Sequence, residues 1–208
     1  MSENFQRKLQ TVANCRAERD CSRGMKIDRD EPARGLKEWS LICDALESGR
    51  QSVILRKGGI AEGRQGFDWK FDRFFLFPTH FHEQASRVRL EEKDQDESQG
   101  VEGFVSIRLF VETLSTARVN EWEEVERLEP FHVWTWETVR DRFHWGDSPG
   151  LFMASVRVSR LAEPWVLADR PAFRGCRSWI DLPEAEAVRE RWDERIEIEP
   201  ACGRPDWL

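Results

Sequence analysis

Several features are absent from this 208-residue sequence, and each absence narrows the class of protein. No apolar run approaches the ~20 residues that a membrane-spanning helix needs, and the N-terminus, MSENFQRKLQ, lacks the apolar segment of a secretion signal. The five cysteines are irregularly spaced and form no CxxC pair. We therefore expect unpaired reduced thiols and a cytoplasmic protein with no membrane partner.

The motifs of the common nucleotide and nuclease sites are also missing. The chain has neither the spacing of a P-loop nor a GxGxxG turn, so nucleotide binding by those two modes is unsupported. No PD…(D/E)xK nuclease arrangement is complete, because LEEK (90–93) supplies only its ExK part and lies in a polar loop. Nothing in the sequence calls for a cofactor.

Tyrosine is absent as well, whereas there are ten tryptophans and thirteen phenylalanines. The net charge of -7 argues against a general nucleic-acid coat and against adhesion to anionic membranes, although it leaves room for a local basic groove. Composition divides the chain into three parts. We expect a loosely ordered extension at 1–33, one domain at 34–182 with a mobile acidic loop at 91–103, and a C-terminal helix and tail at 183–208.

Hydrophobic periodicity indicates both helices and strands. One apolar helical face predicts a helix over 35–48, and Thr135 is a candidate cap for a second helix over 135–146. A third helix is expected at 182–192. The predicted strands, of which the second ends at Pro78 and the third alternates strictly, are 52–57, 71–78, 105–112 and 151–161. This order predicts an α+β fold, with a mixed or largely antiparallel sheet and flanking helices.

The first candidate site is LRKGGI (55–60), where a predicted strand delivers Arg56 and Lys57 next to Gly58 and Gly59. Glycines let backbone amides approach an anion, and the adjacent cations neutralise it, so this segment is a candidate phosphate site. An ordinary hairpin end with solvated charges is the alternative.

The second candidate is the strand end RFFLFPTHFHEQ (73–84), which carries Thr79, His80 and His82. Two histidines at this spacing share a face of a strand and can chelate a metal, but no third ligand completes the set, so we predict no metal site. A role for His82 alone, as an acid–base group or a phosphate contact, requires fewer matching residues than a metal site does. The bland alternative is that these side chains cap the strand.

The segment from Arg50 to Leu90 is basic, with eight basic and four acidic residues, and phenylalanines and Trp69 are interleaved with them. Cations beside aromatic faces suit single-stranded or flipped bases. The alternative is that most of these aromatic rings belong to the core. If strands 52–57 and 71–78 paired antiparallel, His82 would lie roughly 20 Å from Arg56 at typical strand rise, so one shared site requires another arrangement.

Four separate stretches together resemble the bacterial family called domain of unknown function (DUF) 1802. They occur in the family's order, and they are LKEWSLICDALESGRQSVILRKGGI, FFLFPTHFHEQ, VRVSRLAEP and GCRSWIDL. Family members often carry an aromatic residue where His80 stands, which makes His82 the better candidate. The opening ESGRQSVILRK also resembles PUA-like barrels of the ASCH type, which implies a partial barrel. In such barrels a helix and a strand that ends in arginine line a nucleic-acid or nucleotide cleft.

The family has no established activity, but it is sometimes fused to a restriction-endonuclease-like domain. The resemblance therefore implies a nucleic-acid-binding or nucleotide-binding module linked to restriction–modification or DNA defence. The implied partners are DNA or RNA, and a nuclease or other defence-system protein. Two alternatives stay open: an enzyme acting on a nucleotide or phosphoester with His82 as acid–base, and a protein-interaction domain.

Overall fold

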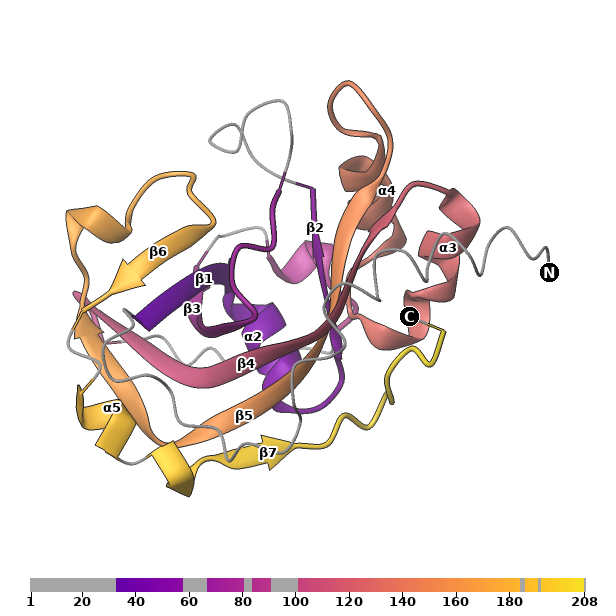
Figure 1. The fold of residues 1–208 in the computed structure, drawn as a ribbon. Coiled ribbons are helices and arrows are strands. Elements are labelled where there is room, and N and C mark those ends of the chain that lie inside the picture. Colours follow the sequence, from indigo (N-terminus) through magenta and orange to yellow (C-terminus); the bar gives the residue numbers. More distant parts are fainter. Residues whose placement is uncertain are drawn as a thin grey trace.

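The computed structural model describes residues 33–57, 67–80, 84–90, 101–183, 186–190 and 192–207. Two long, bent strands dominate these residues and run through the whole molecule (Figure 1). The strands are β1 (Ala33–Trp39), β2 (Val53–Arg56), β3 (Arg73–Thr79), β4 (Phe104–Val119), β5 (Leu151–Ala168), β6 (Trp179–Leu182) and β7 (Ile196–Ile198). The helices are α2 (Ser40–Glu47), α3 (Trp122–Arg127), α4 (Trp136–His144) and α5 (Glu186–Glu190). None of the described helices is long and apolar enough to cross a bilayer.

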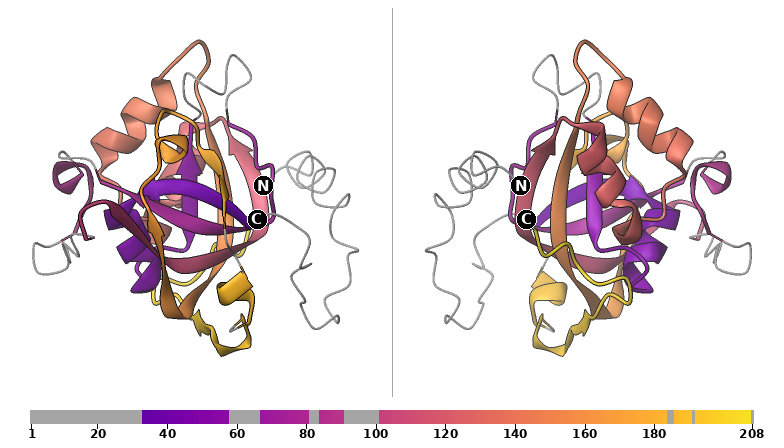
Figure 2. Two further views of the ribbon diagram at one scale, coloured as in Figure 1. Left: turned by 90° about the vertical axis from the view of Figure 1, so that its left-hand side faces the viewer. Right: turned by 90° about the vertical axis from the view of Figure 1, so that its right-hand side faces the viewer.

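The strands form one mixed sheet in the order β2-β5-β4-β3-β1-β6, with β7 paired to β5. β1 and β3 are parallel, whereas the other pairs are antiparallel. The side views of Figure 2 show that the sheet is wrapped rather than flat. Its edge strands β2 and β6 are not paired with each other, so the barrel is incomplete. The expected α+β class with a mixed, partly closed sheet is confirmed.

The structure changes the boundaries of two predicted elements and defines a strand arrangement that the sequence left open. The predicted helix over 35–48 is wrong over its first five residues, because Ala33–Trp39 forms β1 and the helix begins at Ser40. β2 and β3 are not neighbours: β2 pairs with β5, and β3 pairs with β1 and β4. β3 also continues past Pro78 to Thr79, since Pro78 lies opposite Glu38 in the parallel ladder.

A register shift in β4 divides the core. The shift falls between Ile107 and Leu109 and turns Arg108 toward α2. Because a bulge moves the following residues to the other face, the strict alternation predicted for 105–112 does not persist. Ile107 and Phe110 pack in a second core with residues of β6, whereas Leu109 and Val111 pack in the main core.

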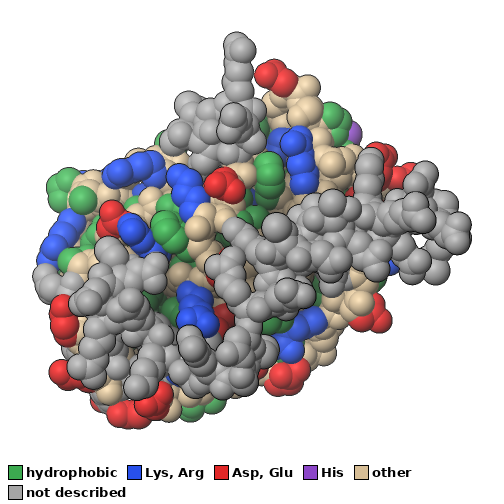
Figure 3. Space-filling view, in the orientation of Figure 1, with side chains coloured by type: hydrophobic (Ala, Val, Ile, Leu, Met, Phe, Trp, Pro, Cys, Tyr) green, Lys and Arg blue, Asp and Glu red, His purple; other side chains and the backbone are tan. Residues whose placement is uncertain are grey.

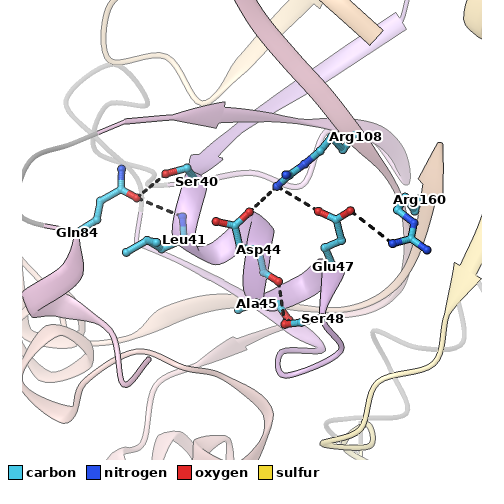
Figure 4. A network of polar contacts seen from close by, with 9 residues as sticks. All are labelled: Ser40, Leu41, Asp44, Ala45, Glu47, Ser48, Gln84, Arg108 and Arg160. Atoms are coloured by element: carbon cyan, nitrogen blue, oxygen red, sulfur yellow. Dashed lines mark hydrogen bonds and ion pairs between the residues drawn. The ribbon is translucent and has the colours of Figure 1, made fainter. Parts of the chain in front are cut away.

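Arg108 and α2 form a network of ion pairs (Figure 4). The Arg108 guanidinium contacts the Asp44 carboxylate and lies 3.1 Å from that of Glu47. Glu47 in turn lies 4.0 Å from Arg160 of β5. Burial lowers the pKa of Arg108, but Glu47 and Asp44 outweigh that effect, so its pKa is raised. These pairs attach α2 to the two long strands.

The later elements follow local signals more closely. α4 begins where its cap was expected, since the Thr135 hydroxyl accepts a hydrogen bond from the Thr138 backbone amide. β5 is longer than the predicted 151–161. Of the helix expected at 182–192, Glu186–Glu190 is helical, as α5, whereas Leu182 belongs to β6. The chain then returns along β7 and ends beside α3 (Figure 1), where the Arg127 guanidinium lies 4.2 Å from the Trp207 ring.

Candidate functional site

Arg56 joins the two unpaired edges of the sheet, a region that we call the seam. From the end of β2 its guanidinium donates to the Ser178 hydroxyl, just before β6, at 2.9 Å and to the Glu38 carboxylate of β1 at 3.3 Å. The same guanidinium lies 5.3 Å from the centre of the Phe67 ring. Side chains, rather than a backbone ladder, therefore hold β2 and β6 together here.

Glu38 is the acidic centre of the seam, and only 2% of its surface is exposed. One carboxylate oxygen accepts the Arg56 hydrogen bond, and the other accepts from the Trp39 backbone amide at 2.9 Å. The Thr79 hydroxyl donates to the Glu38 carbonyl at 3.0 Å. A buried carboxylate needs such partners, because its desolvation is otherwise costly.

Arg142 of α4 supplies a second guanidinium near Glu38. It lies 3.8 Å from the centre of the Trp134 ring and 5.1 Å from that of Trp39. Burial outweighs the opposite effect of Glu38 and, together with the charges of Arg56 and Arg87, lowers the pKa of Arg142 to about 10. Among the described residues we find no hydrogen-bond acceptor or carboxylate within contact distance of this guanidinium.

We call the set Glu38, Trp39, Arg56, Trp134, Arg142 and Ser178 the Glu38 cluster. It contains two guanidiniums and one carboxylate, and that carboxylate already accepts two hydrogen bonds. This excess of positive charge, at the carboxyl ends of β1 and β3, suits an anionic ligand.

Lys57 follows Arg56 directly but points elsewhere. Its ammonium donates to the carbonyls of Phe143, Ser148 and Gly150 at 2.7–2.9 Å. Burial, with a smaller effect of Arg118, lowers the pKa of Lys57. The two neighbouring cations predicted as one phosphate site thus have different partners, because successive residues of a strand face opposite sides.

Thr79 and His80 close the end of β3. Gln84 fixes this end, since its side-chain amide donates to the Thr79 carbonyl at 2.7 Å and accepts from the Leu41 amide at 3.3 Å. Thr79 and Arg56 both donate hydrogen bonds to Glu38, Thr79 to its backbone carbonyl and Arg56 to its carboxylate. His80 is exposed. The other predicted site residues, Gly58, Gly59 and His82, lie outside the described residues, as does most of the acidic loop, 91–100.

Most aromatic residues of the basic segment belong to the core, as the alternative interpretation held. Phe67, Trp69, Phe74 and Phe75 are buried, and Trp179 packs against three of them. The Trp179 indole N–H also donates to the Asp68 carbonyl at 3.0 Å. This packing fills the seam beneath Arg56.

His132 lies in the same part of the molecule and is 3% exposed. Neither of its ring nitrogens has a hydrogen-bond partner among the described residues. Burial, followed by the charges of Arg89 and Arg142, lowers the pKa of His132 to about 3. The ring is therefore held neutral beside the positive side of the Glu38 cluster.

Sequence reasoning identified Arg56 and Thr79 but missed Glu38 and Arg142. Arg142 lies three residues after Val139, on the apolar side of α4, and a charged residue in that position is a signal that was readable. Glu38 carries no such signal, because the apolar pattern of its segment predicts a helix rather than a strand. Within the described residues, no group of three or more His, Cys, Asp or Glu side chains could hold a metal ion.

The fold and the cluster define an α+β domain with an incompletely closed sheet and a cation-rich seam. Residues 35–192 match the family described as "Domain of unknown function (DUF1802)", and the chain belongs to this family. No curated protein matches the sequence.

Among solved structures, the chain is similar to ASCH from Zymomonas mobilis, with 13% identity and a TM-score of 0.46 over 78% of this chain and 94% of that one. A point mutant of the same protein gives 13% identity and a TM-score of 0.47 over 79% and 96%.

Proposed function

We propose that this chain is a nucleic-acid-binding or nucleotide-binding module whose ligand binds at the Glu38 cluster. The proposal rests on the surroundings of Arg142. Its guanidinium lies against two tryptophan rings and has no hydrogen-bond acceptor among the described residues. Phosphate is a strong acceptor for guanidinium, so a phosphate group fits a guanidinium of this kind.

Arg56 supports the same ligand. Two described acceptors, Glu38 and Ser178, each take one hydrogen bond from its guanidinium, which leaves further N–H groups for a ligand. Arg56 and Thr79 both contact Glu38, so two of the residues predicted from the sequence lie at the Glu38 cluster. Lys57, with three carbonyl partners, is not needed.

Arg142→Gln tests the proposal. Binding of fluorescently labelled nucleotides and of single-stranded DNA and RNA is measured by polarisation at low salt. We expect affinity to fall at least roughly tenfold, as the loss of a desolvated charge-assisted contact costs about 1.5–3 kcal/mol.

Arg140→Gln is the matched control, because Arg140 lies on the same helix and over another tryptophan, 5.7 Å from the Trp122 ring. It should leave affinity unchanged. Absence of binding by the wild type to every nucleotide and oligonucleotide would remove the proposal, and equal losses in both variants would show a nonspecific charge effect.

The link to restriction–modification or DNA defence, with a nuclease as partner, belongs to the same proposal and rests on the resemblance to the family. Its test is co-purification of the tagged chain from its native host. A nuclease or methyltransferase that is retained by the wild type, but lost when nucleic acid is digested, would place both proteins on the same nucleic acid.

A further inference from the structure

One row of side chains beside the Glu38 cluster is not explained by the binding of a single nucleotide. Arg118 of β4 lies opposite Phe152 of β5, and Phe152 lies opposite Arg56 of β2. Directly opposed residues in antiparallel strands project from the same face of the sheet, so the three side chains stand side by side. With strands about 4.8 Å apart, the two arginines are anchored about 10 Å from each other.

The middle of this row is aromatic and its outer end is open. The Arg118 guanidinium lies 5.3 Å from the centre of the Phe152 ring, and Phe67 meets that ring edge-on at 6.4 Å. Phe152 is only half-buried and Arg118 is exposed. In Figure 3, Lys and Arg side chains lie among hydrophobic ones near the top of the molecule, on the face seen in Figure 1.

Arg118 is not held by a carboxylate of the described residues. Its described polar contact is a hydrogen bond of 3.3 Å to the Ser148 hydroxyl, which is neutral. Its positive charge also acts on Lys57, whose pKa it lowers. Two cations thus flank a half-buried ring, and no carboxylate of the described residues contacts the outer one.

We propose that Arg118, Phe152 and Arg56 form a binding row for single-stranded nucleic acid, with a base stacked on Phe152 and backbone phosphates paired with the two arginines. The inference rests on the proposed function and extends it from one nucleotide to a strand. A duplex does not fit, since its bases already stack on each other and cannot offer a face to Phe152.

The row makes a prediction about ligand length that the Glu38 cluster alone does not make. A mononucleotide fills the site at Arg142 and leaves Arg118 untouched. A longer strand also contacts Phe152 and Arg118, so affinity rises with length until the row is filled. Each phosphate contact adds about 0.7 to the slope of log affinity against log salt for a single strand.

The experiment compares a mononucleotide with single-stranded oligonucleotides of increasing length, as DNA and as RNA, at several salt concentrations. Arg118→Glu and Phe152→Leu are the variants. We expect each to weaken oligonucleotide binding roughly tenfold, which corresponds to about 1.4 kcal/mol and to the usual contribution of one stacked base. Arg118→Glu should also reduce the salt slope by about 0.7 or more, and mononucleotide binding should be unchanged in both.

Arg127→Glu is the control, because Arg127 makes the same kind of contact with Trp207 beside α3 and lies outside the row. If Phe152→Leu fails to fold, the exposed Arg118 still provides the test. Wild-type affinity that does not rise with length would overturn the row while leaving the proposed function in place. Equal losses for Arg118→Glu and Arg127→Glu would also overturn the row. Absence of any binding, including that of the mononucleotide, would remove the proposed function and the row with it.

Discussion

Arg108 and Arg56 both reach from a strand to a carboxylate on another element, yet their surroundings differ. Arg108 lies between Asp44 and Glu47 of α2, so two carboxylates share one guanidinium, and Glu47 also approaches Arg160. Around Glu38 the ratio of carboxylates to guanidiniums is inverted. The single carboxylate pairs with Arg56, and the nearby Arg142 has no acceptor among the described residues.

This difference separates a structural ion network from a candidate site. A half-buried arginine alone indicates nothing about function, since both clusters contain one. What distinguishes the Glu38 cluster is a second guanidinium, that of Arg142, which has no acceptor among the described residues. Such a group lowers stability but leaves N–H donors available for an anion. The predictions below alter one cluster at a time.

The largest expected effect concerns His132, beside the cation-rich cluster. Its pKa is lowered to about 3 in the folded chain, against an ordinary 6.5. Between these values the unfolded chain binds a proton that the folded chain does not, so stability falls as the pH drops from 6.5 toward 3. At pH 5 this single group costs about 2 kcal/mol. His132→Leu should lack that loss, as measured by urea unfolding at pH 7 and pH 5.

Carboxylates also contribute to acid destabilisation, so the informative quantity is the difference between wild type and variant. His144→Gln is the matched control, because His144 is exposed. It should lose as much stability between pH 7 and pH 5 as the wild type does. A His132→Leu profile parallel to that of the wild type would mean that His132 takes up a proton in the folded chain.

An effect of similar size is expected from breaking the ion-pair network around Arg108. Asp44→Asn combined with Glu47→Gln removes the two carboxylates that contact the half-buried Arg108 guanidinium. Breaking a fully buried pair costs 3–5 kcal/mol, and the 26% exposure of Arg108 reduces this to about 2 kcal/mol. Urea unfolding should show this loss, while ligand affinity at the Glu38 cluster should stay unchanged.

Glu197→Gln provides the comparison for that double variant. It removes the contact of 3.1 Å between Glu197 and Arg157, both more than a third exposed, and should change stability by less than about 0.5 kcal/mol. A double variant as stable as Glu197→Gln would show that the network of Figure 4 contributes little, and the contrast between the two clusters would then rest on the Glu38 side alone.

The sequence predicted elements wherever the signal was local. α4 has its cap at Thr135 and its apolar face at Val139 and Phe143, and these require no knowledge of the rest of the chain. The segment before Ser40 was misassigned because Leu36 and Trp39 fit a helical face, whereas its pairing with β3 and β6 is a tertiary fact. Tertiary pairing commonly overrides such propensities.

The site was only partly predictable for a related reason. Arg56 was found because it ends a strand beside glycines, but its partners Glu38 and Ser178 lie 18 and 122 residues away in the sequence. The register shift near Arg108 likewise carries no local signature in an alternating strand. The curvature of the sheet brings these charged residues together at the seam, and no single segment of the sequence determines that curvature.

The smallest expected effect tests whether Lys57 belongs to the site, as its position next to Arg56 suggested. Lys57 ties the end of α4 to the start of β5 through three carbonyls, so Lys57→Met should cost about 1–2 kcal/mol in urea unfolding. Its affinity for nucleotides should remain that of the wild type, because methionine keeps the length of the side chain and the ammonium has no contact with Glu38 or Arg142. Arg56→Met is the matched change one residue earlier, and it should weaken binding roughly tenfold through loss of a charge-assisted contact. If both variants weakened binding equally, the two neighbouring cations would act as one phosphate site, and the assignment of Lys57 to a purely structural role would be wrong.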